Sequence, residues 1–161
     1  MLSGRIHSNG ACFRIMKLTA HIGISTVAAA SVYTITGSQR LSLSLLLSGI
    51  FIDLDHVVDY VLLSEERFTR KNFFSWYDER RWNKIYIIFH SYELLAIFLL
   101  MTFWFRNDIM IGVAIGCSLH LLADQIGNVS MRLSERFSLW FYFFSYRYHT
   151  GFEKKNFLVN K

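Results

Sequence analysis

The chain has 161 residues, of which 53% are hydrophobic, 17% aromatic and 18% charged. Soluble domains carry about 25% charged residues, so this composition argues against an ordinary soluble domain and against a disordered chain. Four membrane-crossing helices of about 20 residues each would use about half of the sequence. That leaves no room within these residues for a large soluble domain.

Four apolar segments have the length of a membrane-spanning helix. In chain order they are residues 18–35, 43–63, 85–105 and 109–126. A fifth apolar segment, residues 137–146, is short and rich in aromatic side chains, which is typical of a helix lying in the membrane interface. The sequence therefore predicts an all-α fold, an integral membrane helical bundle of four transmembrane helices plus an interfacial C-terminal helix.

The segments also predict the domain organisation. We expect a flexible extension over residues 1–15, a single membrane-embedded helical domain over residues 16–149 and a basic tail over residues 150–161. Met16 followed by Lys17 would itself be a suitable start of the protein, so the residues before it are expected to be dispensable.

The distribution of Lys and Arg predicts how the bundle lies in the membrane. Residues 1–17 contain three of these cations, 64–84 contain six and 128–161 contain six, whereas the short loops 36–42 and 106–108 contain one each. The positive-inside rule then places both termini and the long link in the cytoplasm of a multi-pass protein of the cell inner (plasma) membrane. This orientation accounts for the net charge of +5, so we expect membrane lipids as partners and no nucleic acid.

Ionisable residues inside the predicted spans are the most informative feature of the sequence. Each charge at the centre of a bilayer costs about 2.5–3.5 kcal/mol on the insertion scale, so a group of them needs compensation. Because neighbouring spans run in opposite directions, these residues fall in the cytoplasmic halves of their helices and meet at one depth. They are His21 in the first span, Asp53, Asp55, His56 and Asp59 in the second, His90 and Glu93 in the third, and His120 and Asp124 in the fourth.

Helical phase indicates which of these side chains share a face. At about 100° per residue, His120 and Asp124 are ~40° apart and so point the same way. Asp53 and Asp55 are ~160° apart, so both can face the site only if the helix is distorted there. Gly49, just upstream, would permit such a distortion, and otherwise one of the two carboxylates acts as a partner of a ligand.

Three or more histidines with several carboxylates form a ligand set for Zn²⁺, Mn²⁺ or Fe²⁺. Zinc is the first choice but not the only one, and the candidates suffice for one or two ions. Two divalent ions about 3.5–4 Å apart would activate water for hydrolysis and stabilise charge on an attacked phosphoryl or acyl group. Glu93 or a spare aspartate such as Asp55 would then serve as the catalytic general base.

Several of these residues also have a structural interpretation. Asp59 lies near the interface, where water can solvate it, and Glu93 is a candidate hydrogen-bond partner for His90. The basic and aromatic residues of the long link and of the C-terminal part are typical of membrane anchoring. The functional alternative is that Arg147 or His149 helps to bind the head group of a substrate, with His149 also open as a further metal ligand.

Four short motifs carry most of these candidates. They are Thr19–Ala20–His21, Gly49–Ile50–Phe51–Ile52–Asp53–Leu54–Asp55–His56, Phe89–His90–Ser91 and His120–Leu121–Leu122–Ala123–Asp124. These motifs resemble those of the YdjM-like membrane-bound metal-dependent hydrolases, over most of residues 16–128. The resemblance implies a metal site formed by His21, Asp53, Asp55, His56, His90, His120 and Asp124. The chain departs from that family at Ile52, where a proline is common, and at Ile85–Tyr86, where a His-Arg pair is common.

We therefore expect a metal-dependent hydrolase that cleaves an ester or phosphoester of a lipid-like substrate near the cytoplasmic face. One alternative is a metal-handling or proton-coupled transporter, which would need ionisable groups that reach toward the opposite face. The outer halves of the predicted spans contain almost none. Another alternative is a non-catalytic membrane adaptor in which a fully ligated ion has a structural role.

Overall fold

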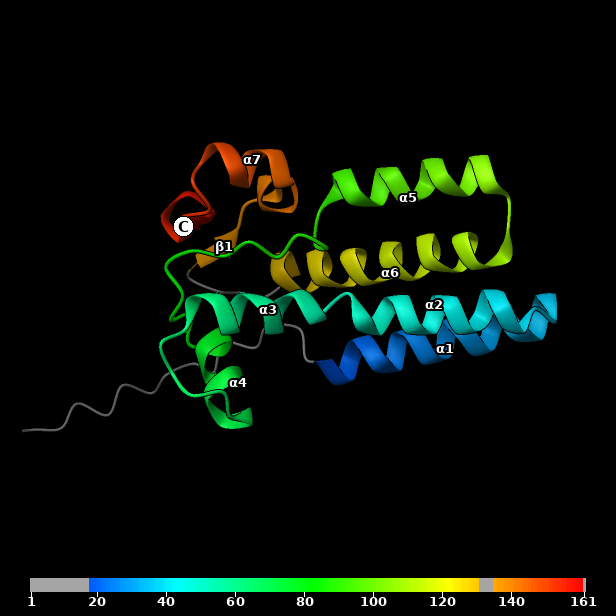
Figure 1. The fold of residues 1–161 in the computed structure, drawn as a ribbon, viewed down its shortest axis with the longest axis horizontal. Coiled ribbons are helices and arrows are strands. Elements are labelled where there is room, and N and C mark those ends of the chain that lie inside the picture. The colour runs from blue at the N-terminus through cyan, green and yellow to red at the C-terminus, as the bar shows by residue number, and fades with distance from the viewer. Residues whose placement is uncertain (1–17, 131–134, 161) are drawn as a thin grey trace, which may run out of the picture.

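The computed structural model describes residues 18–130 and 135–160, and the predicted extension over residues 1–15 lies outside this part. The predicted all-α class is confirmed, apart from one short two-stranded ribbon (Figure 1). The α-helices are α1 (Leu18–Thr36), α2 (Gln39–Phe51), α3 (Leu54–Leu63), α4 (Arg70–Asp78), α5 (Tyr92–Phe105), α6 (Asp108–Ser130) and α7 (Phe144–His149). The antiparallel strands are β1 (Glu135–Phe137) and β2 (Leu158–Asn160), and the 3₁₀ helices are η1 (Leu139–Tyr142) and η2 (Lys154–Asn156).

Three helical segments are long and apolar enough to cross a membrane: α1, the joined pair α2–α3 over Gln39–Leu63, and Asp108–Gly127 of α6. They support the predicted membrane bundle. The third predicted span, residues 85–105, is shorter than expected, because α5 has only 14 residues. Such a helix rises about 21 Å, against about 30 Å of hydrocarbon. The described part of the chain thus contains three membrane-length helices and one shorter apolar helix.

The late start of α5 has a cause in the preceding loop. Residues 85–90 are mostly apolar but not helical. Ile87 has a positive φ of 31°, which a right-handed helix does not allow, and the N–H groups of Tyr86 and Ile87 donate to the carboxylate of Asp59 on α3. The hydroxyl of Ser91 then caps the first turn of α5.

Helices α2 and α6 share the most extensive contact in the bundle, and α1 packs mainly on α2 (Figure 1). A Cβ added at Gly112 or Gly116 of α6 would overlap the backbone of α2 at Leu41 or Leu45. The spacing of four residues places both glycines on one face, a pattern that lets membrane helices approach closely. This contact holds His120, one turn after Gly116, against α2.

The rod formed by α2 and α3 is broken at Ile52 and Asp53, as expected for a distortion near Gly49. The backbone of Asp53 has φ −70° and ψ −5°, and the N–H of His56 donates to the Asp53 carbonyl oxygen at 3.1 Å. A hydrogen bond between residues three apart is typical of a 3₁₀ turn, which is tighter than an α-helical turn. It therefore changes the direction in which the side chains that follow point around the helix axis.

The aromatic C-terminal segment folds differently from the prediction. Instead of one interfacial helix over residues 137–146, the chain forms the end of β1, then η1 and the start of α7. Phe141 and Tyr142 are buried in the protein and do not face lipid. Burial of these side chains in the protein accounts for the aromatic content of residues 137–146 as well as a position in the membrane interface does. The residues that follow α7 return to the fold, where Phe157 is fully buried.

An aromatic core lies at the end of the bundle where α3, α4 and the C-terminal segment meet (Figure 1). Its buried aromatic members are Tyr60, Trp76, Tyr77, Trp82, Phe141, Tyr142 and Phe157. Ile85 and Ile87 of the loop before α5 are buried in the same core. The core therefore anchors the loop that carries His90.

The close approach of α2 and α6 is testable with two matched glycine substitutions. Gly116→Ala should lower the midpoint of thermal unfolding of the detergent-solubilised protein, because the added methyl overlaps α2 and overpacking costs about 1–3 kcal/mol. Gly23→Ala is the control, since a Cβ at Gly23 meets nothing within 4 Å and alanine favours helix. Equal destabilisation by both substitutions would contradict the packing described.

Candidate metal centre

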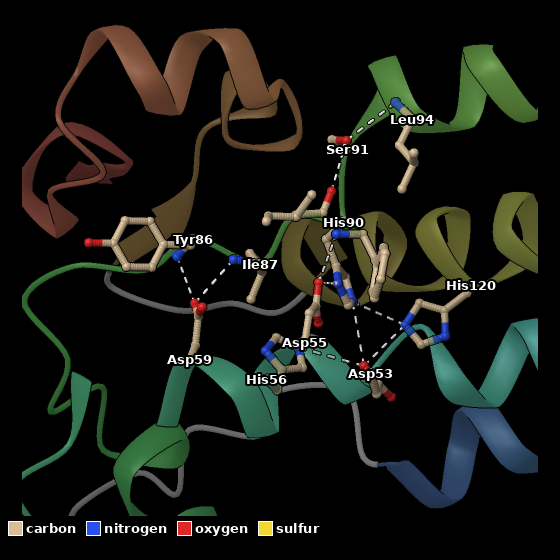
Figure 2. A network of polar contacts seen from close by, with 12 residues as sticks. Asp53, Asp55, His56, Asp59, Tyr86, Ile87, His90, Ser91, Leu94 and His120 are labelled. Atoms are coloured by element: carbon tan, nitrogen blue, oxygen red, sulfur yellow. Dashed lines mark hydrogen bonds and ion pairs between the residues drawn. The ribbon is translucent and has the colours of Figure 1, made fainter. Parts of the chain in front are cut away.

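Six side chains from five places in the fold converge near the break between α2 and α3, and Figure 2 shows four of them, Asp53, His56, His90 and His120. They are His21 at the start of α1, Asp53 at the break, His56 on α3, His90 in the loop before α5, and His120 and Asp124 on α6. The imidazoles of His21, His90 and His120 are buried. The structure thus brings together ionisable residues that the sequence placed at one depth in separate helices.

The six residues divide into two groups, each with two imidazoles and one carboxylate. One group contains His21, His120 and Asp124, the other contains Asp53, His56 and His90, and the ligand atoms of each group lie within 4.8 Å of one another. His21 Nε2 is 3.0 Å from Asp124 Oδ1, and His56 Nε2 is 3.6 Å from Asp53 Oδ1. Each group has the composition of a divalent metal site with nitrogen and oxygen ligands.

The two groups touch and so form one centre. His90 Nε2 lies 3.2 Å from His120 Nε2, 3.4 Å from Asp53 Oδ1 and 3.3 Å from Asp124 Oδ2. His120 Nε2 lies 3.3 Å from Asp53 Oδ1 and 3.5 Å from Asp124 Oδ2. Two ring nitrogens and two carboxylate oxygens therefore meet in one small region.

The proton positions on the two central imidazoles follow from their outer contacts. His120 Nδ1 lies 2.8 Å from the carbonyl oxygen of Gly49, which can only accept, so Nδ1 carries the proton. His90 Nδ1 lies 3.0 Å from Asp55 Oδ2 and donates to it for the same reason. In a neutral ring, Nε2 then keeps its lone pair. Metal-bound histidines are held in this way, with the second ring nitrogen bound to an acceptor.

These lone pairs and carboxylates need a positive charge between them. In these neutral tautomers the two Nε2 lone pairs, at 3.2 Å, repel each other, and neither nitrogen can donate to a carboxylate. The surroundings thus favour a cation at this point. A divalent metal ion fits, because the ring nitrogens and carboxylate oxygens are all ligand types that it accepts.

Two further carboxylates on α3 hold the loop that carries His90. Asp55 Oδ2 accepts the N–H of Phe89 at 2.9 Å in addition to the His90 Nδ1 proton. Asp59 Oδ2 accepts the N–H groups of Tyr86 and of the next residue, at 2.6 and 3.1 Å. Of the seven residues predicted as ligands, only Asp55 belongs to neither group. It contacts Nδ1 of the His90 imidazole instead (Figure 2).

Glu93, predicted as a catalytic base, is engaged by a different part of the fold. Its carboxylate accepts the N–H of Phe144 at 2.9 Å, and both the N–H at 2.9 Å and the hydroxyl of Ser145 at 2.7 Å. These backbone N–H groups lie in the first turn of α7, where they have no helical acceptor and an acidic side chain satisfies them. Glu93 thus joins α5 to α7 and belongs to neither ligand group, and its catalytic role stays a prediction.

Arg147, predicted to bind a substrate head group, is fully buried. Its guanidinium donates to the carbonyl oxygens of Ile87 at 3.0 Å and His90 at 3.1 Å. Burial lowers its pKa to about 10, which leaves it charged at neutral pH. Arg147 therefore fixes the His90 loop and cannot reach a head group. His149 is exposed and belongs to neither ligand group.

Two contributions to the centre were not expected from the sequence. The carbonyl of Gly49 orients His120, whereas the sequence indicated Gly49 only as a point of distortion. Tyr77 on α4 donates its hydroxyl to the carbonyl oxygen of His56 at 2.7 Å, and its ring lies edge-on to that imidazole. Tyr77 is one of several aromatic residues in the long link, and nothing in the sequence singles it out for such a contact.

The fold and the centre together define a helical membrane protein with a candidate metal site. Comparisons of the chain with protein-family models, with curated proteins and with solved structures found no match. The chemistry of the centre is therefore interpreted from its own geometry.

The contact of Asp55 with His90 predicts the effect of one conservative substitution. Asp55→Asn keeps the shape of the side chain and an oxygen that can accept from Nδ1, but it removes the negative charge that faces the imidazole. We expect the affinity for Zn²⁺, measured by competition with a chromophoric chelator, to fall about 10–100-fold, as is typical for a lost partner of a metal ligand.

Asp59→Asn is the matched control for this substitution. It makes the same chemical change on the same helix, and the retained oxygen can still accept the two loop N–H groups. Its zinc affinity should stay within about threefold of the wild-type value, since the residue contacts no imidazole. Unchanged affinity in Asp55→Asn would contradict the role of Asp55 as the partner of the His90 imidazole.

Proposed function

We propose that the protein is a membrane-bound hydrolase in which one or two divalent metal ions promote cleavage of an ester or phosphoester in a lipid-like substrate. The observation that carries this proposal is the meeting of the His90 and His120 Nε2 lone pairs with the carboxylates of Asp53 and Asp124. A resemblance to the YdjM-like membrane-bound hydrolases rests on the same residues and points to the same chemistry.

The donor types favour zinc, with Mn²⁺ or Fe²⁺ as alternatives. Imidazole nitrogen and carboxylate oxygen suit all three ions, and both ligand groups lack a thiolate. Because each group has two imidazoles and one carboxylate, we assign one ion to each. When bound, such ions lower the pKa of a bound water toward neutrality and stabilise charge on the group under attack.

The side chains of the second group offer a route to the centre. The side chain of Asp53 is 20% exposed and that of His56 is 22% exposed, whereas those of His90 and His120 are 2% or less. Water would therefore approach on the side of Asp53 and His56. With Glu93 held by α7, we assign the general base to Asp53, the more accessible of the carboxylates at the centre, through the carboxylate oxygen that the ligand group does not use.

The reaction needs three events at the bond that is cleaved. The oxygen of water forms a bond to phosphorus or to the acyl carbon, and the bond to the leaving oxygen breaks. The proton that Asp53 accepts from water passes to the leaving oxygen. Asp55 holds His90 in the tautomer that keeps Nε2 free, so it is a positioning residue for this chemistry.

A lipid-like substrate follows from the place of the centre in the bundle. His21, Asp53 and His120 belong to the three segments that are long and apolar enough to cross a membrane. The distribution of Lys and Arg supports an inner-membrane location with the centre near the cytoplasmic face. A bilayer amphiphile can reach such a site from within the membrane, whereas a free metabolite would have to leave water.

Metal analysis with a hydrolysis assay tests this function. The purified wild-type protein should retain one to two equivalents of zinc, cleave a chromogenic short-chain phosphodiester or carboxylic ester, and lose this activity when a chelator removes the metal. His120→Ala removes a ligand of the centre. It should therefore lower the metal content, and it should lower kcat/KM by at least about 100-fold. His149→Ala, an exposed histidine outside the centre, should change neither.

Other outcomes would identify a different function. A protein that binds no metal would contradict the hydrolase. A protein that keeps its metal but cleaves neither ester class would be the membrane adaptor with a structural ion. Metal uptake into sealed vesicles without hydrolysis would identify a transporter.

A further inference from the structure

An apolar pocket of about 180 Å³ lies between α2, α5 and α6. Its wall includes Phe51 and Ile52 from the end of α2, Phe98 from α5 and Val113 from α6. None of the described residues that line it is charged. Its one serine, Ser48, donates its hydroxyl to a carbonyl oxygen of its own helix at 3.1 Å, so it offers little to a polar ligand.

Three lining residues are neighbours of metal-centre residues in the chain. Ile52 immediately precedes Asp53, and Phe89 immediately precedes His90. Cys117 lies one helical turn before His120 on α6. The Phe89 backbone also donates to Asp55, which orients His90. The pocket thus adjoins the centre on the side of α5.

The pocket opens beside α5, the helix whose side chains are least buried in the bundle. None of the fourteen residues of α5 is buried, although nearly all of them are apolar. Phe51 and Phe89 form the rim and are 52% and 46% exposed. In a bilayer, an apolar opening beside a helix of this kind faces hydrocarbon chains and not water.

We propose that this pocket binds an acyl chain of the membrane lipid substrate, so that the ester or phosphoester of the same molecule lies at the metal centre. This inference rests on the proposed function and specifies its substrate class. A flexible chain suits a small apolar pocket without polar partners, and burial of its methylenes supplies the binding free energy. The lipid enters between α2 and α5, past the rim, without leaving the membrane.

The binding test uses the full-length protein in phosphatidylcholine nanodiscs, where no detergent competes for the pocket. The probe is a phospholipid with a photoactivatable diazirine in one acyl chain. We expect labelling of α6 at Val113 and Cys117, which line the pocket, and the pocket-filling variant distinguishes this labelling from that by lipid that only surrounds the protein. Val113→Trp fills the pocket and should reduce this labelling about 10-fold, the loss expected when about two methylenes are no longer buried.

Val27→Trp is the matched control. Val27 is 68% exposed on α1 and lies outside the pocket, so the same change there should leave the labelling of α6 intact. Metal content should equal that of the wild type in both variants. Phe98→Ala provides a second variant that does not crowd the fold, and it should increase labelling by a probe with a branched chain. Absence of label on α6 of the wild type would overturn the pocket proposal.

A kinetic comparison separates this proposal from the proposed function. Val113→Trp should lower kcat/KM about 10-fold for a long-chain substrate and leave it unchanged for a water-soluble short-chain one. Equal losses for both substrates would overturn the acyl-chain assignment while the hydrolase stands. Specific labelling of α6 in a protein that hydrolyses nothing would remove the hydrolase and leave the acyl-chain site in place.

Discussion

Two imidazole nitrogens face each other at 3.2 Å inside an apolar bundle, and each has an outer partner that leaves its lone pair free. Carboxylates of Asp53 and Asp124 meet at the same point and offer only acceptors. In a low-dielectric setting, uncompensated groups of this kind are costly, and a shared cation would stabilise them. The proposed metal site would account for so many ionisable residues at one place in an apolar bundle.

The rest of the fold fixes this arrangement from two directions. On one side, the glycine face of α6 lets α2 approach closely enough for the Gly49 carbonyl to orient His120. On the other, His90 lies in a loop without helical hydrogen bonds, held by Asp55 from α3 and by Arg147 from α7. Because these contacts come from distant parts of the chain, the geometry of the centre depends on the whole fold.

The apolar segments could be predicted because membrane-length helices depend on composition over about 20 residues, which is visible in one sequence. The shared depth of His21, His90 and His120 could be predicted for a related reason, since depth follows from position within each span. The ~160° phase difference between Asp53 and Asp55 on a regular helix indicated either a distortion or a partner role for one carboxylate, and the structure has both a break at Asp53 and Asp55 bound to His90 Nδ1.

The failures concern contacts between residues far apart in the sequence. The loop before α5 looks helical by its apolar content, but Ile87 has a positive φ, and Asp59, 27 residues before Tyr86, binds the loop from α3. Glu93 and Arg147 have the chemistry of an active site, and they are engaged by α7 and by loop carbonyls, respectively. Residue type and spacing do not carry that information, because the partner of each group is set by tertiary packing.

X-ray absorption spectroscopy at the zinc edge of the metal-loaded protein in membranes tests the central claim most directly. The account predicts nitrogen and oxygen neighbours at about 2.0–2.2 Å, with imidazole scattering from two histidines per ion and no sulfur. A shell of sulfur at about 2.3 Å, or a hydrated ion without imidazole, would contradict it.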